Sequence, residues 1–435
     1  MTPPEGRQPF WRLARRPDVV VIGAGIVGLA SAYELAQRKL RVCVLDAAEP
    51  GAGQSSRNWG FLRQQGRAIE ELPIMIEACR MWRELPGRLG ADLEWVQGGN
   101  LRLTDQPERA EDYHRWIDVA RSCGLDSRVV TDEEVALIVP GFRARFALAI
   151  FTPSDGQVNP ARAVAAYSGA LAPEQVDVFS GCPARAIVTS GGAVAGVQTD
   201  DWFVPASNVV LAAGVGSGAL LRELGLHMPV QLVCQTVALT EKEPWLTDAC
   251  VWTGRVGFRQ TASGQVLLSA GGRGQVVADP GALRSLLAPR QLRQALPMYW
   301  KNREYLQVRP REALATIARR GGNHYHLGGH VRYEDVEEAL AAMAECIPGR
   351  ERRAVTAWAG TIDGTPDALP VIDTVGPGAG VVVATGMSGH GFGIAPAVGR
   401  IVADLVVTGK SHHELHPFRL ARFAEGTAKP PHHLL

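Results

Sequence analysis

DVVVIGAGIVGLASAYELAQRKLRVCVLD, residues 18–46, decides the fold of this chain. The stretch opens with a short run of apolar, mostly β-branched residues, which is long enough for one buried strand. Three glycines follow with GxGxxG spacing, then a segment with helical apolar periodicity, then a second apolar run that ends on Asp46. This order of strand, glycine turn, helix, strand and acid predicts a βαβ unit that binds a dinucleotide.

The three glycines have separate expected tasks. Gly23 permits the tight turn out of the strand, Gly25 lets the backbone approach a pyrophosphate, and Gly28 lets the helix lie close to the sheet. Ile26 and Val27 begin the helix, whose free amides attract phosphate. The motif alone does not separate NAD from FAD, and a βαβ unit that binds nothing is the alternative.

A glycine-rich, hydroxyl-rich and basic loop follows the second strand, at residues 47–67. Asp46, directly before it, can accept hydrogen bonds from ribose hydroxyls. Ser55, Ser56 and Arg57 can donate hydrogen bonds to phosphate oxygens. The alternative interpretation is a solvated surface loop, but a long loop beside a ribose-binding acid is often functional.

The composition is typical of a globular enzyme. At 435 residues the chain exceeds one usual core, so we expect two closely joined domains. Apolar residues make up 46% of the chain and charged residues 20%, which are ordinary values. The net charge of +1 does not favour nucleic acid or an acidic membrane as a partner.

Neither the cysteines nor the ends of the chain indicate secretion. The seven cysteines show no CxxC spacing, so we expect neither disulfides nor a zinc site, and a cytoplasmic location fits best. Residues 1–16 lack the apolar segment of a signal peptide. No stretch reaches eighteen apolar residues, so no membrane-spanning helix is expected. Residues 1–16 and the tail from about Lys410 are expected to be loose ends.

A second glycine-rich turn lies near the other end of the chain. Residues 381–386 predict a strand, GMSGHGFG at 386–393 predicts a glycine loop, and a helix is expected from about Pro396. Residues 208–214 predict another strand, which runs into small residues where backbone could pass close to a cofactor. A flavin, with an adenosine at one end and a large ring at the other, needs two such loops, whereas an NAD dehydrogenase rarely does.

Together these motifs resemble the D-amino-acid oxidase superfamily of FAD-dependent oxidoreductases over residues 18–410. Within it the chain is most similar to the sarcosine oxidase and sarcosine oxidase β-subunit group, with D-amino-acid and hydroxyproline dehydrogenases nearby. The motifs that carry the resemblance are VVVIGAGIVGLASAYELA with VLD, SSRNWG, VVLAAG, TPDALPVID and GMSGHGFGIAPAVGR. The resemblance implies an α/β fold: a Rossmann-like FAD-binding domain of the GR2 type with an inserted α+β substrate domain built on an antiparallel sheet.

The implied domains alternate along the chain. The FAD-binding domain would take residues 17–95, 151–225 and 353–410, the substrate domain would take residues 96–150 and 226–352, and residues 411–435 would form a tail.

The resemblance also assigns roles to single residues. The ADP half of FAD would be held by Gly23, Gly25, Gly28 and Asp46, the pyrophosphate by Ser55, Ser56 and Arg57, the adenine side by Ala213 and Gly214, and the isoalloxazine ring by Gly389, His390, Gly391, Phe392 and Gly393. The family's arginine that anchors the substrate carboxylate falls on Arg63, whose planar fork can pair with a carboxylate bidentately. The alternative for Arg63 is a solvated loop arginine.

Three positions depart from the family pattern. Sarcosine oxidases attach their flavin through a cysteine where this chain has about Gly360, so the resemblance implies non-covalent FAD. Gly393 replaces a lysine that would be a second carboxylate anchor. The lysine linked to oxygen activation falls near Leu267, so oxygen would be a poor electron acceptor and a quinone or a protein carrier could replace it.

The remaining candidates are histidines and one arginine. In NHYHLGGH, a predicted turn at Gly328 and Gly329 separates His330 from His324 and His326, and no acidic partner is close by, so no metal is expected. His390 could tune the flavin, contact the substrate or serve only in packing. Arg273 could line the substrate pocket or be solvated.

The resemblance implies an enzyme of amino-acid catabolism. Its substrate would be a D-amino acid, an N-methyl amino acid such as sarcosine, or a cyclic imino acid, with the C–N bond oxidised to an imine by hydride transfer to flavin N5. We expect no catalytic triad, because the flavin carries the chemistry. The alternatives are a flavoprotein β-type subunit of a multi-chain dehydrogenase, inactive alone and requiring a second subunit, and an NAD-dependent dehydrogenase.

Overall fold

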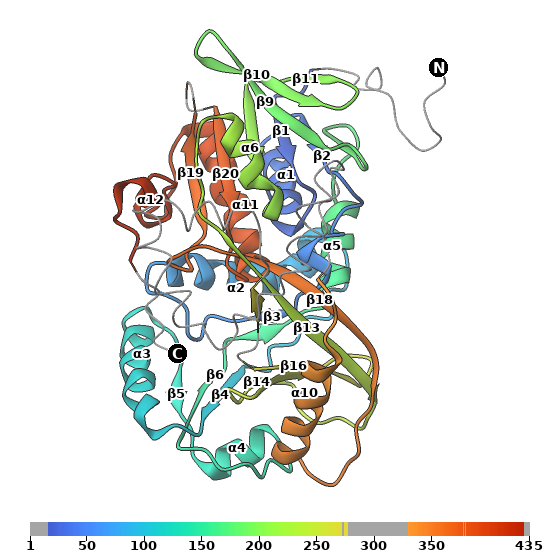
Figure 1. The fold of residues 1–435 in the computed structure, drawn as a ribbon, viewed down its shortest axis with the longest axis vertical. Coiled ribbons are helices and arrows are strands. Elements are labelled where there is room, and N and C mark those ends of the chain that lie inside the picture. The colour runs from blue at the N-terminus through green and yellow to red at the C-terminus, as the bar shows by residue number, and fades with distance from the viewer. Residues whose placement is uncertain (1–15, 272–273, 277–328, 377, 379, 430–435) are drawn as a thin grey trace.

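The computed structural model describes residues 16–271, 274–276, 329–376, 378 and 380–429 (Figure 1). His324, His326 and Arg273 lie outside the described residues. Two large sheets organise this part of the chain, one with six strands and one with nine. The six-stranded sheet lies in the upper half of Figure 1 and most of the nine-stranded sheet in the lower half.

The six-stranded sheet contains the predicted βαβ unit. In spatial order its strands are β19 (Val371–Val375), β20 (Val381–Thr385), β12 (Asn208–Leu211), β1 (Val19–Ile22), β2 (Val42–Leu45) and β8 (Val176–Phe179). All neighbours pair in parallel except β19 and β20. Both faces are covered, as parallel sheets require, because Val19 and Val21 of β1 join one apolar cluster while Val20 and Ile22 join another.

Different elements cover the two faces of this sheet. One face packs against the helices α1 (Ile26–Gln37), α2 (Leu72–Leu89), α5 (Pro160–Gly169) and α11 (Gly391–Thr408). The other packs against α6 (Ser217–Glu223) and a three-stranded sheet of β9 (Ala184–Ser190), β10 (Ala193–Thr199) and β11 (Phe203–Pro205). Helices α1 and α11 lie very close, since a Cβ at Gly399 would lie 2.7 Å from the carbonyl of Ala30.

The nine-stranded sheet is largely antiparallel. Its main path is β17 (Gln275–Val276), β13 (Gln231–Lys242), β16 (Gln265–Ala270), β15 (Val256–Gln260), β14 (Cys250–Trp252), β4 (Asn100–Thr104), β6 (Leu148–Thr152) and β5 (Arg128–Val129), and β18 (Ala354–Gly364) pairs with β13. The helices α4 (Asp132–Ile138) and α10 (Tyr333–Cys346) contribute to its main core, and α3 (Ala110–Ser122) to a smaller one.

Shorter elements complete the described part of the chain. They are the β3 (Phe61–Leu62) and β7 (Gly156–Gln157) ribbon, the 3-10 turns η2 (Gln54–Ser56), η3 (Pro107–Arg109), η4 (Gly214–Gly216) and η7 (His416–Phe418), and the helix α12 (Arg422–Glu425). Pro160 opens α5 as predicted, and the side chain of Asn159 caps that helix. All seven cysteines are free thiols.

The expected start of the last long helix at Pro396 was wrong. Helix α11 already begins at Gly391, and Pro396 lies inside it. The glycine loop therefore leads straight into the helix, and its own amides are the free N-terminal N–H groups. Helix α11 is long and apolar enough to cross a membrane, but most of it is buried against α1, α2 and the sheet, as in a core helix.

The expectation of a loose tail from Lys410 was also wrong for residues 411–429. Phe418 is fully buried, and the guanidinium of Arg422 pairs with both carboxylate oxygens of Asp367 at 2.7 and 3.0 Å. The backbone amide of Leu420 donates to Asp373 on β19. Polar composition suggested a free end, but these few specific contacts fix the segment against the six-stranded sheet.

Candidate cofactor and substrate site

A cavity of about 670 Å³ is lined by residues of both large sheets. Its walls come from the turn between β1 and α1, the end of β2, the loop at residues 51–67, the end of β12, part of β18 and the loop before α11. This volume is typical of ligand pockets. Both glycine loops, which lie more than three hundred residues apart, therefore meet at one site.

The cavity gathers most of the residues that the sequence predicted for the site. Those that line it are Gly23, Gly25, Ile26, Val27, Asp46, Ser55, Arg57, Arg63, Ala213, Gly214, Gly389, His390, Gly391, Phe392 and Gly393. Gly28 and Ser56 do not line it. Gly28 lies beneath the turn, where a Cβ would fall 1.9 Å from the carbonyl oxygen of Gly23. Ser56 is exposed, and its hydroxyl lies 3.5 Å from the carbonyl oxygen of Gly53.

The first glycine turn has the features of an anion site. Gly23 has a left-handed φ of 108°, and a Cβ there would lie 2.3 Å from the carbonyl oxygen of Ala212. Helix α1 has no side-chain cap at Gly25 and no acidic residue in its first turn. The hydroxyl of Ser55 accepts a hydrogen bond from the amide of Ile26 at 2.8 Å. These features leave helix N-terminal amides beside the cavity for a pyrophosphate.

Asp46 is held rigidly at the end of β2. Its two carboxylate oxygens accept hydrogen bonds from the amides of Ala24 and Ala48, at 2.5 and 2.8 Å. Burial raises the pKa of Asp46. Gln54 also lines the cavity, and its side-chain nitrogen is buried without a partner among the described residues. Because Asp46 is fixed beside the first glycine turn, this end of the cavity fits the ADP half of FAD.

The second glycine loop is braced by helix α2. Ser388 and Gly389 both have left-handed backbones, with φ of 51° and 81°. The indole nitrogen of Trp82 donates to the carbonyl oxygen of Gly393 at 2.8 Å, and its ring stacks on Phe392 with centroids 5.3 Å apart. No side chain caps α11 at His390. This helix N-terminus therefore also presents amides to the cavity.

His390 forms a pair with Glu71, a residue of the turn before α2. The Nδ1 atom of His390 lies 2.8 Å from a carboxylate oxygen of Glu71, whose side chain is fully buried. Burial lowers the pKa of His390, and the nearby Arg67 lowers it further, while Glu71 opposes both. Burial alone would raise the pKa of Glu71, but His390 and Arg67 hold it below its usual value. The geometry fits a neutral imidazole that donates from Nδ1 to an ionised carboxylate.

Three arginines, Arg63, Arg67 and Arg102, line the same part of the cavity. Burial lowers the pKa of Arg63 well below its ordinary value, and the positive charges of Arg67 and Arg102 lower it further. Arg67 has a partner in Glu71, with Nε and Oε1 3.9 Å apart, whereas no described residue forms an ion pair with Arg63. A bound anion would relieve this concentration of positive charge.

Several polar residues of the cavity carried no sequence signal. Arg102 donates to the hydroxyl of Tyr113 at 3.3 Å. Both side-chain polar atoms of Asn100 are buried and unpartnered. Asp363 accepts from the amide of Gly386 at 3.1 Å, and burial raises its pKa to about 6. These residues lie on strands of the nine-stranded sheet, and only the pairing of distant strands brings them here. A local signal existed only for Arg67 and Glu71, which are spaced as neighbours on a helix.

The structure shows where two of the positions that depart from the family pattern lie. Gly360 of β18 lines the cavity, and no cysteine is among the described lining residues. Leu267 of β16 is buried in the sheet, and the described lining includes no lysine.

Comparisons with known proteins agree with this geometry. The family described as "DAO: FAD dependent oxidoreductase" matches residues 18–405. The chain is 25% identical to sarcosine oxidase subunit beta of Arthrobacter sp, over 94% of this chain and 91% of that protein. It is 26% identical to glycine oxidase of Geobacillus kaustophilus, over 94% of this chain and 98% of that protein. The crystal structure of L-proline dehydrogenase from P. horikoshii has the same fold, with a TM-score of 0.78 at 23% identity, covering 95% of this chain and 99% of that one. The protein therefore belongs to the DAO family of FAD-dependent oxidoreductases, and its cofactor is FAD.

Proposed function

We propose that this enzyme oxidises the C–N bond of a small amino acid or secondary amine to an imine. The observation that carries the proposal is Arg63, a guanidinium in the cofactor cavity with no ion pair among the described residues. The relatives named sarcosine oxidase and glycine oxidase support the same substrate class. D-amino acids, N-methyl amino acids and cyclic imino acids all belong to it. Bound FAD would supply the hydride acceptor.

Arg63 would anchor the substrate by its carboxylate. A guanidinium pairs with a carboxylate through two parallel hydrogen bonds, which fixes orientation as well as position. Arg67 and Arg102 add positive charge beside Arg63, so the carboxylate group of a bound substrate would offset part of that charge. Fixing the substrate in this way would hold its reacting C–H bond in a productive position.

His390 would accept the proton that the substrate amine must lose. Amino acids are ammonium ions at neutral pH, and only the neutral amine has a lone pair that can assist loss of the hydride. With Nδ1 donating to Glu71, the lone pair of His390 lies on Nε2, for which no described residue is a hydrogen-bond partner. Glu71 would act as a positioning residue, because it fixes the tautomer and the ring orientation.

Residues at both ends of the cavity would hold FAD without a covalent bond. The proposed contacts come from the amides at the start of α11, the amides of the first turn of α1 beyond Ile26, Asp46 and Ser55. The amides at the start of α11 can stabilise negative charge on the ring that they cover. The absence of cysteine from the described lining supports a non-covalent cofactor.

The same lining supports a proposal for the electron acceptor. Without a lysine among the described lining residues, we propose a quinone or a protein carrier in preference to oxygen. A second candidate function is a β-type subunit of a multi-chain dehydrogenase, because sarcosine oxidase subunit beta is matched over 91% of its length. Co-purification of a second chain that is required for turnover would favour this candidate.

The proposed function can be tested without knowing the electron acceptor. The FAD-loaded protein is mixed anaerobically with a panel of D-, N-methyl and cyclic amino acids, and the flavin absorbance is followed. We expect at least one member to bleach the flavin, while the matching amines without a carboxylate do so far more slowly. If dithionite bleaches the flavin but no member of the panel does, the proposed substrate class is wrong.

The carboxylate anchor makes a quantitative prediction. Arg63→Ala should raise the KM of the best substrate at least about tenfold, since hydrogen bonds to charged groups contribute roughly 1.5–3 kcal/mol. Arg63→Lys should raise the KM by a smaller factor than Arg63→Ala, because lysine keeps the charge but loses the planar fork. Arg83→Ala, an exposed arginine on α2, is the control. An unchanged KM in Arg63→Ala would exclude this anchor.

The His390–Glu71 pair predicts a shift in the pH profile. The negative charge of Glu71 raises the pKa of His390, so Glu71→Gln should lower that pKa. Activity requires the neutral imidazole, so the rising acidic limb of kcat/KM should move to lower pH while kcat falls. Glu84→Gln, an exposed glutamate on α2, the helix that follows Glu71, should leave the limb in place. A limb that stays at the wild-type pH in Glu71→Gln would rule out His390 as the base.

A further inference from the structure

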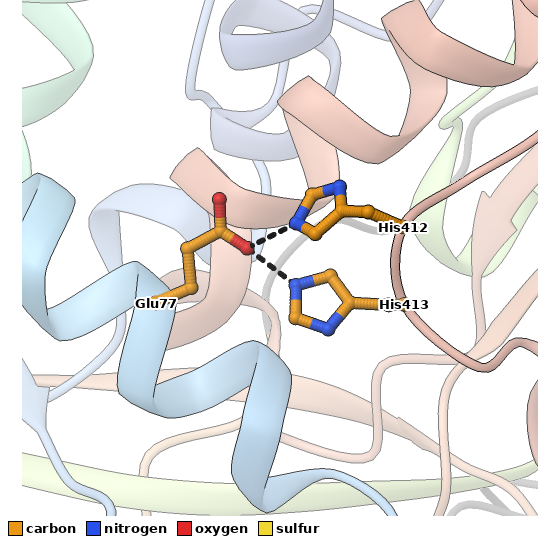
Figure 2. A group of neighbouring side chains, drawn as sticks. All are labelled: Glu77, His412 and His413. Carbon is orange, nitrogen blue, oxygen red and sulfur yellow. Dashed lines mark hydrogen bonds and ion pairs between the residues drawn. The ribbon is translucent and has the colours of Figure 1, made fainter.

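Three potential metal ligands meet on the outer side of α2, outside the cofactor cavity (Figure 2). Glu77 comes from α2, and His412 and His413 come from the segment that follows α11. Both histidines direct Nε2 at the same carboxylate oxygen of Glu77, with His412 at 2.9 Å and His413 closer. The three ligand atoms all lie within 4.8 Å of one another. None of the three residues lines the cavity.

The cluster is partly enclosed. The side chains of Glu77 and His413 are 16% and 11% exposed, whereas that of His412 is 52% exposed. Two ligands are thus held in place by the surrounding protein, and the third faces solvent. This arrangement gives an ion a route of entry and leaves room for a water molecule as a further ligand.

The ligand types select the kind of ion. Two imidazole nitrogens and one carboxylate oxygen suit zinc and its neighbours, whereas calcium and magnesium prefer oxygen ligands throughout. Zinc bonds of about 2.0–2.1 Å place the ligands of a tetrahedral site about 3.3 Å apart. Both histidine–glutamate separations are shorter than this, so an outward movement of the two rings would admit the ion.

Groups around the cluster hold the ligands in orientation. Arg400 donates to the other carboxylate oxygen of Glu77 at 2.7 Å, which leaves the histidine-facing oxygen free for an ion. Asp404 lies 3.5 Å from Nδ1 of His412, on the side of the ring away from Glu77. A carboxylate behind a histidine ligand is the usual outer contact in zinc sites. Asp404 also pairs with Arg38, which offsets part of its charge.

We propose that Glu77, His412 and His413 bind one zinc ion or a similar divalent transition metal. The ion would join α2 to the chain that leaves α11. Helix α2 also carries Trp82, which donates a hydrogen bond to Gly393 at the start of α11. The metal would therefore strengthen the contact between two helices that flank the flavin loop, while taking no part in the oxidation.

The test measures zinc binding directly. The FAD-loaded protein is stripped with a chelator, desalted and titrated with zinc chloride in a calorimeter. We expect one equivalent per chain, which the double variant His412→Ala/His413→Ala loses. Glu77→Gln, which keeps a hydrogen-bond acceptor for Arg400, should weaken binding at least about tenfold. His416→Ala removes an exposed histidine three residues further on and should bind zinc like the wild type.

Flavin absorbance in each variant shows whether the protein has folded. Zinc should also raise the Tm of the wild type and leave that of the double variant unchanged, since a ligand stabilises only a fold that binds it. A wild type that takes up no stoichiometric zinc would mean that the cluster is only a hydrogen-bonded contact. Equal binding by the double variant would place the zinc elsewhere and overturn the proposal.

Discussion

The cofactor cavity depends on backbone segments that pack closely at the glycines after β1. Only hydrogen fits at Gly23 and Gly28, because a Cβ at either position would fall within 2.3 Å of a carbonyl oxygen. This packing lets α1 begin directly at the end of β1. Helix α11 also lies close to α1, because a Cβ at Gly399 would fall 2.7 Å from the carbonyl of Ala30. Two helix N-termini whose own N-cap residues supply no side-chain cap are thus brought to one cavity, where their amides can favour negative charge on a ligand.

Helix α2 and the turn before it connect the cofactor and substrate parts of the cavity. Glu71 holds His390, and Trp82 holds the carbonyl of Gly393, so two contacts fix the loop that leads into α11. Glu71 also lies close to Arg67, and through it the loop is linked to the group of arginines that line the cavity. The loop geometry and the charge of the arginine-lined part of the cavity therefore depend on the same few buried residues. Substitution of Glu71 should therefore affect cofactor binding and catalysis together.

The sequence predicted the parts of the fold that have local patterns. The βαβ unit could be read from residues 18–46 because strand, turn and helix each leave a signature within a few residues. The prediction that the two glycine loops meet at one site rested on the resemblance to the FAD-dependent family and on the shape of a flavin. Arg102, Asn100 and Asp363 could not be found in this way, because their place in the cavity depends on strand pairing between distant segments. The ordered segment at 411–429 was missed because buried contacts such as Arg422 with Asp367 have no periodic pattern.

Titration of the cofactor-free protein with FAD, followed by flavin fluorescence, tests the central claim most directly. The account predicts saturation at one FAD per chain. A bulky residue at either glycine turn, as in Gly28→Val or Gly391→Val, should weaken binding, because both ends of the cavity must hold the same molecule. A folded protein that binds no FAD at any concentration would contradict the account. So would a protein in which substitution at the second turn leaves FAD affinity unchanged.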